Sequence, residues 1–586
     1  MNQVEIIVEK NVPCTMRDGI VLYADVYRPN VTGHFPVLLT RLPYSKDLPL
    51  YSHRYLDTHR LVENGFVVII QDVRGRFQSE GEFQPFSQEA DDGYDTVEWA
   101  ASLSYSTGKV GMFGLSYYGY TQLLAAEKKP PHLVAIFPAM TLNDQRNGTV
   151  YRNGAFALGL FETWTLESIM PDLLKRKYEK NEERTSAFRK LADSLNKIEE
   201  WYAYAPINNW PPLKVLDEVN YFFEHLNHPI EDESYWQESS IIDKYDRLQL
   251  PAYHLGGWYD CFIGPTLENY VEMAKVNDPS KNQKLIVGPW GHGLFSSIQG
   301  ERSFGVHASG DWINLEEDIT NLHIRWFNHW LKGMDNGIEK EPPVKIFVMG
   351  INVWRDEMEW PLERTDYTRY YLHSKGQANT KTGDGRLSKV KQEDEKTDSF
   401  IYDPKNPVPT KGGGTLFSGP LTMGPYDQSG IEKRDDVLVY TSEPLNEALE
   451  VTGPVKVKLW ASTDAANTDF TAKLVDKSPD GTANILTEGI VNAKYRNGHH
   501  AEKELNGEIV EYEINLWATS NVFLPGHRIL LEISSSSFPQ YAPNPNTGKS
   551  MIESSETKQA RQTIYHSREF PSHILLPIIP TRENTL

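Results

Sequence analysis

The chain has 586 residues, of which 39% are hydrophobic, 11% aromatic and 24% charged. This composition is typical of globular proteins with several domains and excludes disordered and collagen-like chains. With 80 acidic and 59 basic residues, the formal net charge is −21, and no run of five or more like charges occurs. A nucleic-acid partner is therefore not expected.

Only two cysteines are present, Cys14 and Cys261, so we expect neither a disulfide framework nor a CxxC metal or redox motif. The first ten residues lack the basic and apolar segments of a signal peptide. No stretch approaches eighteen uncharged apolar residues, so no membrane partner is expected. We predict a soluble cytoplasmic protein, with leaderless export as the alternative.

Strands and helices alternate in the first part of the chain, residues 1–144. Apolar and polar residues alternate from Val4 to Asn30 around Asp18-Gly19, which predicts a β-hairpin. Further strands are predicted at 35–40, 67–70 and 110–113, and helices at 91–102 and 120–128. This alternation predicts a doubly wound, mostly parallel sheet.

The pattern changes between residues 145 and 245, where apolar residues follow helical spacing amid dense charge. This segment is predicted to be a helical insertion. Residues 246–340 return to the first pattern, with short strands at 251–255 and 284–287 and an amphipathic stretch at 315–331. The insertion therefore interrupts one α/β domain.

Residues 341–586 read as many short strands separated by Gly, Pro and Asn turns, which predicts a sandwich or jelly roll. The clearest strands are 344–350, 369–374, 454–462, 512–519 and 527–534. Residues 375–396 are polar and Gly-rich, and we expect a loop or an irregular excursion there.

The chemical signal lies in the sequence Gly114-Leu115-Ser116-Tyr117-Tyr118-Gly119. It departs by one residue from the G-x-S-x-G pentapeptide of α/β-hydrolases, and alone it would suit a structural turn serine. However, an apolar strand precedes Ser116 and a helical run follows it. That is the strand-turn-helix context of a nucleophile elbow, so Ser116 is the candidate nucleophile.

A serine nucleophile needs a general base and a carboxylate that orients the base, in the chain order Ser, acid, His. Asp260 follows the strand at 251–255, and His292 follows the strand at 284–287. We therefore predict a triad of Ser116, Asp260 and His292. Asp72 precedes Ser116 and is interpreted as structural, bound to nearby backbone or to Arg74.

Other histidines do not suggest a metal. His254 lies inside an apolar run and is predicted to belong to the core. His323 and His329 are six residues apart on a predicted helix, a spacing that does not place two ligands on one face. No metal and no cofactor are expected.

An acyl-transfer enzyme also needs two donors for the developing oxyanion. The backbone N–H of Tyr117 follows from the elbow geometry. Tyr44, in the loop after the strand at 35–40, is the candidate for the second donor through its hydroxyl. The alternative is an ordinary half-buried tyrosine.

Five segments together carry a family resemblance: RLPYSK, QDVRGRFQSEGEF, GMFGLSYYGY, GGWYDCF and GPWGH. With further likeness through YDPKNPVPTKGGGTLF and GHRILLEISSSSFPQYAPNPNTG, the chain resembles the cocaine esterase-like hydrolases. These are grouped with the X-Pro dipeptidyl-peptidases, cephalosporin acylases and α-amino-acid ester hydrolases. The resemblance extends over nearly the whole chain.

The resemblance implies an α/β-hydrolase domain with a helical cap and a C-terminal jelly-roll domain. It also implies that Ser116, His292 and Asp260 are nucleophile, base and orienting acid, and that Tyr44 contributes to the oxyanion hole. Trp164, Phe262 and Phe417 match positions where esterases of the family line an apolar acyl pocket, although each could equally be core packing.

The resulting hypothesis is a cofactor-free serine hydrolase that cleaves small-molecule esters or acyl amides with an apolar or aromatic acyl group. Two alternatives are a glutaryl- or cephalosporin-type acylase and an α-amino-acid ester hydrolase. The latter is disfavoured because Cys261, Phe262 and Ile263 stand where that subfamily carries ammonium-binding carboxylates. A different class, a catalytically silent carbohydrate-binding protein, is the remaining alternative. Homo-oligomerisation is left open, and Cys261 is interpreted as inert.

Overall fold

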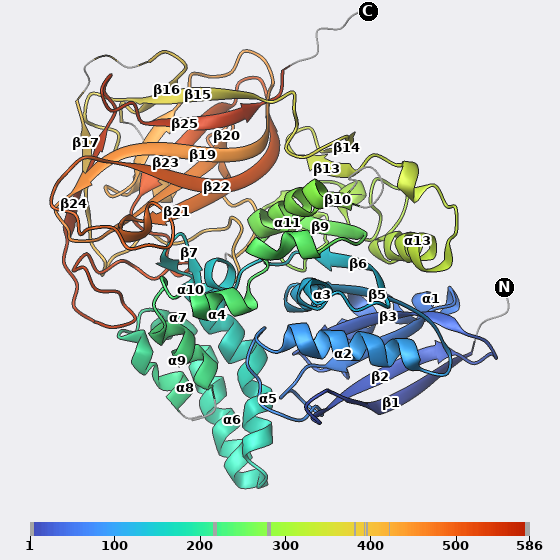
Figure 1. Cartoon of the computed structure of the whole chain (residues 1–586). Helices are drawn as coiled ribbons and strands as arrows, with labels where there is room; N and C mark the ends of the chain where they lie inside the picture. The colour runs from blue at the N-terminus through green and yellow to red at the C-terminus, as the bar shows by residue number, and fades with distance from the viewer. Residues whose placement is uncertain are drawn as a thin grey trace, which may run out of the picture.

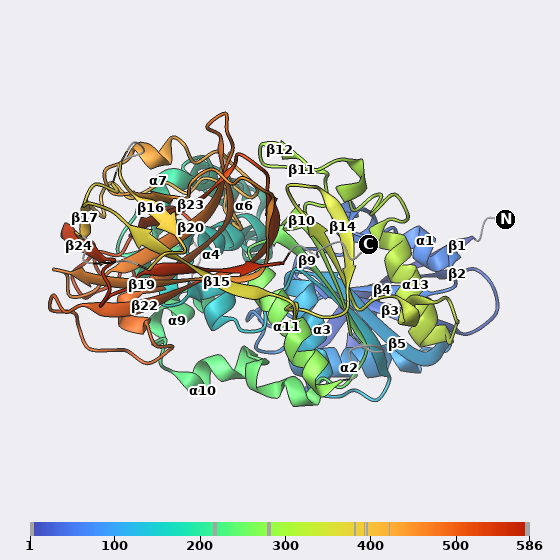
Figure 2. The same ribbon diagram turned by 90° about the horizontal axis from the view of Figure 1, so that it is seen from above.

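The computed structural model describes residues 5–214, 219–277, 283–379, 383–391, 393, 396–420 and 422–580. Two large sheets dominate it, one in each half of the chain, and a group of helices lies beside them (Figure 1). Seen from above, the two sheets lie side by side along the long direction of the molecule (Figure 2).

The N-terminal sheet has ten strands in the order β1-β2-β4-β3-β5-β6-β9-β10-β13-β14. Its strands are β1 (Ile6–Thr15), β2 (Val21–Pro29), β3 (Phe35–Leu42), β4 (Val67–Asp72), β5 (Ser106–Leu115), β6 (Leu133–Ala139), β9 (Ala252–Tyr259), β10 (Gln283–Gly291), β13 (Val344–Val348) and β14 (Val353–Glu357). Pairing is parallel from β4 through β13 and antiparallel at both edges. This agrees with the predicted doubly wound α/β-hydrolase sheet.

Helices cover both faces of this sheet because its central strands are apolar on both sides. In β4, Val67 and Ile69 pack in a cluster with α2 (Glu89–Ser102) and α3 (Tyr117–Glu127). Val68 and Ile70 pack in another cluster with α1 (Thr58–Glu63) and α13 (Ile319–Lys332). The carboxyl ends of the parallel strands are consequently held in a fixed arrangement.

In the sequence, a set of helices is inserted between β6 and β9, although these two strands pair directly with each other in the sheet. We call this set, from α4 to α10, the cap. Its members are α4 (Leu158–Thr163), η3 (Trp164–Ile169), α5 (Met170–Lys177), α6 (Asn181–Asn196), α7 (Ile198–Tyr202), α8 (Pro211–Lys214), α9 (Asn220–Asn227) and α10 (Glu233–Trp236). A short hairpin of β7 (Tyr151–Arg152) and β8 (Ala155–Phe156) precedes the cap. In Figure 1 the cap lies below the C-terminal strands.

The C-terminal sheet has eleven strands, almost all antiparallel, wrapped around an apolar core. They are β15 (Asp366–His373), β16 (Arg386–Ser388), β17 (Asp398–Tyr402), β18 (Leu438–Thr441), β19 (Leu449–Thr463), β20 (Asp469–Lys477), β21 (Ala483–Asn492), β22 (Val510–Phe523), β23 (Arg528–Ser534), β24 (Ala560–Tyr565) and β25 (His573–Ile578). The predicted C-terminal β-domain is therefore present.

Three local expectations differ from the structure. Residues 344–350 were expected in the C-terminal sheet, but β13 pairs in parallel with β10, and β14 follows as the edge strand of the N-terminal sheet. An apolar strand signal does not identify its partner, which explains the error. Within the polar segment 375–396, residues 386–388 form β16, and the amphipathic helix begins at Ile319 rather than at residue 315.

Among the described residues, no helix is both long enough and apolar enough to cross a membrane.

Candidate active site

Ser116 lies in the sharp turn between β5 and α3, with φ of 60° and ψ of −124°. A non-glycine residue in this region is strained, as expected for a nucleophile elbow. The two glycines of the motif allow the turn. A Cβ at Gly114 would lie 2.3 Å from the Tyr118 carbonyl oxygen, and one at Gly119 would lie 2.8 Å from Thr141 Cβ. The turn here thus requires glycine two residues before and three residues after the serine.

The three predicted triad residues lie together at the carboxyl ends of β5, β9 and β10. His292 Nε2 is 2.9 Å from Ser116 Oγ, and His292 Nδ1 is 2.7 Å from Asp260 Oδ1. The strands that lead to Asp260 and His292 are parallel neighbours, with Gly291 opposite Tyr259. This register explains how two residues far apart in sequence reach hydrogen-bond distance.

Asp260 is fully buried, and the side chain of His292 is 9% exposed. The Phe262 ring contacts the His292 ring edge-on, with centroids 5.3 Å apart. Gly414, from the C-terminal half, covers the other side of the acid: a Cβ there would lie 3.0 Å from the Asp260 carbonyl oxygen. Both halves of the chain therefore shield the His–Asp pair from water, which strengthens its interaction.

Tyr44, the candidate oxyanion donor, accepts a hydrogen bond from Trp164 Nε1 at 3.0 Å. Burial raises the pKa of the Tyr44 phenol above its usual range, and hydrogen bonds with Trp164 and Ser116 oppose that rise. The hydroxyl is consequently protonated at neutral pH and able to donate. Because Tyr44 lies close to Ser116, its hydroxyl is on the same side of the site as the candidate nucleophile.

The other candidate donor is the Tyr117 amide. Tyr117 is the first residue of α3, where a backbone N–H has no acceptor within the helix. The Tyr117 side chain does not participate, because its hydroxyl donates to Glu89 Oε1 at 2.8 Å and accepts from Phe86 N at 3.2 Å. These two buried hydrogen bonds of the side chain hold Tyr117, and with it the amide, in place.

The loop after β3, residues 43–47, is tied to the sheet below it. Asp72 Oδ1 accepts from the Lys46 backbone N–H at 2.9 Å, and Lys46 Nζ lies 3.3 Å from Asp25. Burial raises the pKa of Asp72 to about 6. Of the two predicted partners of Asp72, nearby backbone and Arg74, the structure has the first, through the Lys46 N–H; Arg74 pairs instead with Asp92.

Arg76 connects the loop of Tyr44 to the cap, and the sequence analysis did not identify it. Its guanidinium is fully buried and donates to three backbone carbonyls: Pro43 at 2.9 Å, Ile169 at 3.0 Å and Ser168 at 3.1 Å. The first belongs to the loop of Tyr44, and the others belong to the cap segment that begins at Trp164. The only sequence feature that could have indicated this role is the second arginine of the segment VRGRF.

The three predicted pocket residues, Trp164, Phe262 and Phe417, all belong to or pack against the large hydrophobic cluster that also includes α2, α3 and the cap, and Tyr44 packs against the same cluster. Trp164 stacks on Tyr117 with ring centroids 6.1 Å apart. Phe417 arrives from the C-terminal half. The next residue, Ser418, fixes it by donating its backbone N–H to Thr163 Oγ1 and the Tyr202 hydroxyl, each at 3.1 Å.

Among the described residues, one group has the composition of a metal site: Asp260, Cys261 and His292, whose ligand atoms lie within 4.8 Å of one another. Asp260 and His292 already hydrogen-bond to each other, and His292 also to Ser116. Burial raises the pKa of the Cys261 thiol well above its usual value, so the thiolate that a metal would need is disfavoured. His254 and His323 are buried in the core.

Known proteins are similar to this chain over nearly its whole length. The family model of the X-Pro dipeptidyl-peptidases (S15 family) matches residues 18–294, and that of the X-Pro dipeptidyl-peptidase C-terminal non-catalytic domain matches residues 336–575. A cocaine esterase of Rhodococcus sp. (strain MB1 Bresler) is 40% identical over 98% of both chains.

Two solved structures have the same fold. An aminopeptidase from a marine sediment Thaumarchaeota archaeon is 25% identical, with a TM-score of 0.80 over 99% of this chain and 97% of its own. An α-amino acid ester hydrolase is 24% identical, with a TM-score of 0.80 over 98% of this chain and 97% of its own. The chain belongs to the cocaine esterase-like serine hydrolases of the X-Pro dipeptidyl-peptidase (S15) family.

Proposed function

We propose that the protein hydrolyses carboxylic esters with an apolar or aromatic acyl group, through an acyl-enzyme on Ser116. The observation that carries this proposal is the continuous hydrogen-bonded path from Asp260 through His292 to Ser116. Asp260 accepts from His292 Nδ1–H, which leaves Nε2 unprotonated and facing the serine hydroxyl.

In acylation, Ser116 Oγ attacks the ester carbonyl carbon while its proton moves to His292 Nε2. The negative charge that develops on the carbonyl oxygen is stabilised by the Tyr44 hydroxyl and the Tyr117 amide. Collapse of the tetrahedral intermediate breaks the bond to the alcohol oxygen, which takes the proton from His292. The acyl group remains on Ser116 and the alcohol leaves.

Deacylation repeats these steps with water. His292 Nε2 takes a proton from the water, whose oxygen attacks the acyl carbon. The same two donors stabilise the second oxyanion. The bond to Ser116 Oγ then breaks, the proton returns from His292 to Oγ, and the carboxylic acid is released.

The acyl preference rests on Trp164, Phe262 and Phe417. An aromatic lining favours an apolar acyl group because burying such surface is favourable and a flat ring can stack on it. Burial raises the pKa of the Glu162 carboxyl, near Trp164, well above its usual value. Burial thus disfavours a negative charge on Glu162, which weakens the α-amino-ester alternative.

The test is turnover of a panel by wild type and Ser116→Ala: p-nitrophenyl benzoate and acetate, a free α-amino ester, glutaryl and phenylacetyl amides, and Ala-Pro-nitroanilide. We expect wild type to prefer the aromatic acyl ester and Ser116→Ala to lose turnover by roughly 10⁴-fold or more. Preference for an acyl amide would make the enzyme an acylase. Turnover that survives Ser116→Ala would refute the nucleophile.

We also propose a cytoplasmic location. Cys14 and Cys261 are both free and buried, a pattern typical of proteins in a reducing compartment. Fractionation of the source cells, with the activity followed in each fraction, tests this.

A further inference from the structure

A second cavity lies away from the triad, where the C-terminal sheet meets the β7–β8 hairpin and the cap. Its volume is about 250 Å³, below the usual range for drug-sized ligands but enough for a small molecule. Four segments of the chain form it: residues 151–156, residues 226–231, residues 467–495 around β20 and β21, and residues 542–553. None of its lining residues belongs to the triad or the acyl pocket.

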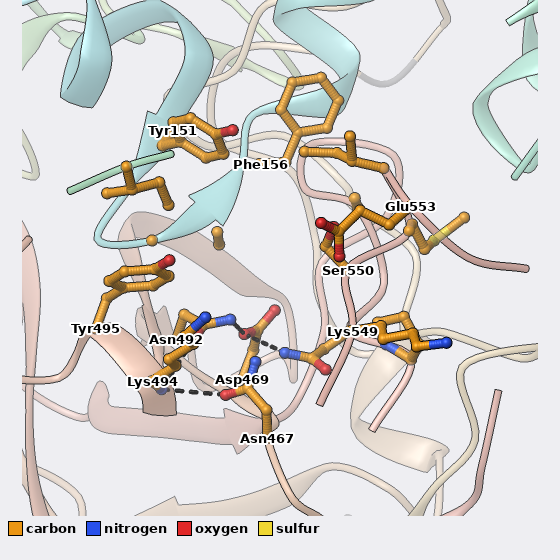
Figure 3. Close-up of a pocket in the computed structure, with 18 of the residues that line it drawn as sticks. Tyr151, Phe156, Asn467, Asp469, Asn492, Lys494, Tyr495, Lys549, Ser550 and Glu553 are labelled. Atoms are coloured by element: carbon orange, nitrogen blue, oxygen red, sulfur yellow. Dashed lines mark hydrogen bonds between the residues drawn. The ribbon is translucent and has the colours of Figure 1, made fainter. Parts of the chain in front are cut away.

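One side of this cavity carries aromatic rings and carboxylates. The rings of Tyr151, Phe156 and Tyr495 line it together with Glu231 and Glu553. Figure 3 shows the Tyr495 hydroxyl and the Glu553 carboxylate projecting into the space from opposite sides, with Tyr151 and Phe156 above them. Tyr495 packs closely over Gly154, where a Cβ would come within 2.5 Å of its ring.

The carboxylates on this side lack a cation. Glu231 Oε1 accepts from the Tyr495 hydroxyl at 3.2 Å, and no lysine or arginine of the described residues lies within ion-pair distance of Glu231 or Glu553. Lys494, which also lines the cavity, lies over the Tyr495 ring with Nζ 5.5 Å from its centroid. Lys549 also lines the cavity. Because Glu553 is exposed and Glu231 is half-buried, both carboxylates are accessible to a ligand.

Two further polar groups are available inside the cavity. Tyr151 is only 5% exposed, and its hydroxyl makes no hydrogen bond to the described residues. Asp469 is 2% exposed. Its Oδ1 accepts from Asn492 at 2.7 Å and Asn544 at 2.9 Å, while Oδ2 has no partner in the part of the chain that the structure describes. Both atoms are open to solvent in the cavity and can therefore hydrogen-bond to water or to a ligand there.

We propose that this cavity binds a small organic cation, with its ammonium group between Glu231 and Glu553 and its carbon atoms against the rings of Tyr151 and Tyr495. Aromatic faces attract cations through the ring quadrupole, and the attraction increases where water is excluded. Hydroxyl groups on the ligand would pair with Tyr151 and Asp469. The site is independent of the Ser116 chemistry.

The experiment is calorimetric titration of the full chain with choline, compared with 3,3-dimethylbutan-1-ol, which has the same shape without the charge. Glu231→Gln and Glu553→Gln each remove one negative charge and keep the side-chain shape. Glu556→Gln, an exposed neighbour outside the cavity lining, is the matched control for net charge. Ester turnover of every variant reports correct folding.

We expect saturable choline binding that weakens about tenfold in Glu231→Gln and about threefold in Glu553→Gln, because Glu231 is half-buried and Glu553 is exposed. Binding should be unchanged in Glu556→Gln. The neutral analogue should bind far more weakly. The proposal is overturned by no saturation up to about 10 mM choline, by equal binding of the neutral analogue, or by affinity that survives both cavity substitutions. Binding of benzoate instead of choline would identify Lys494 as the anchor of an anion site and also overturn it.

Discussion

Trp164 Nε1 donates a hydrogen bond to the Tyr44 hydroxyl, and this 3.0 Å contact joins the cap to the loop after β3. Since the indole uses a lone pair of the phenolic oxygen, the phenolic proton is left to point elsewhere. The Ser116 side chain lies close enough to the Tyr44 hydroxyl to oppose the rise in its pKa. The cap thereby sets the direction in which Tyr44 donates.

Trp164→Phe keeps an aromatic ring in the pocket but removes this donor. We expect kcat for p-nitrophenyl acetate to fall about tenfold, with little change in KM, because a net hydrogen bond contributes about that factor. Trp201→Phe is the matched control, since the buried Trp201 Nε1 has no partner among the described residues. Equal effects of the two substitutions would contradict a directing role for Trp164.

Tyr44→Phe removes the proposed oxyanion donor itself. The loss should fall on kcat, by about 10²- to 10³-fold, because this interaction strengthens as charge develops. Tyr51 stacks on Tyr44, with ring centroids 5.3 Å apart, so Tyr51→Phe tests whether loss of a neighbouring hydroxyl matters. If steady-state kinetics give Tyr44→Phe the kcat of wild type, the second donor must be sought elsewhere.

Asp260→Asn tests the orienting acid. A neutral amide neither holds His292 in the required tautomer nor stabilises the imidazolium, so kcat/KM at pH 7 should fall about 10³- to 10⁴-fold. Labelling of Ser116 by a fluorophosphonate, followed by intact-protein mass, should slow in parallel. Labelling at the wild-type rate would show that His292 works without Asp260.

Arg76→Lys tests the link between the loop of Tyr44 and the cap. One ammonium lacks the planar fork that reaches the carbonyls of Pro43, Ser168 and Ile169 together. We expect kcat to fall about tenfold in the folded enzyme, with the active-site concentration measured by fluorophosphonate titration. Arg176→Lys, which loses contacts to the carbonyls of Phe77 and Ser79, is the control and should retain a higher kcat.

Asp469 predicts a pH dependence of stability. Burial raises its pKa to about 7 in the folded chain, against an ordinary value near 4 when unfolded. The folded state therefore binds more protons, so this carboxyl stabilises the fold at low pH and the contribution is lost as the pH rises from about 4 through 7. Asp469→Asn keeps the acceptor for Asn492 and Asn544. Its urea midpoint should decline less than that of wild type between pH 5 and 8; parallel curves would contradict the assignment.

The sequence was sufficient to predict that Ser116, Asp260 and His292 lie together, because each follows a recognisable apolar strand in the expected chain order. Their catalytic roles stay a prediction. Tyr44 needed the family resemblance, since a lone tyrosine in a loop has no periodic signal. The role of Arg76 and the packing of Phe417 against Gly159 of the cap depend on contacts between distant segments, which no local pattern encodes. The prediction that β13 belongs to the C-terminal sheet was wrong for the same reason.

The enzyme class is now established by the relatives, so the catalytically silent carbohydrate-binding alternative is withdrawn. What the relatives do not determine is the acyl preference, for which the aromatic lining is the argument.

Gly414 has a consequence for protein engineering. Because its bare α-carbon fits against the Asp260 carbonyl, the C-terminal half forms part of the wall behind the acid. In a hybrid that joins this N-terminal half to the C-terminal half of a relative, a residue larger than glycine at the matching place would push this contact apart by a few tenths of an ångström. The three predicted triad side chains would therefore not by themselves determine the activity of such a hybrid.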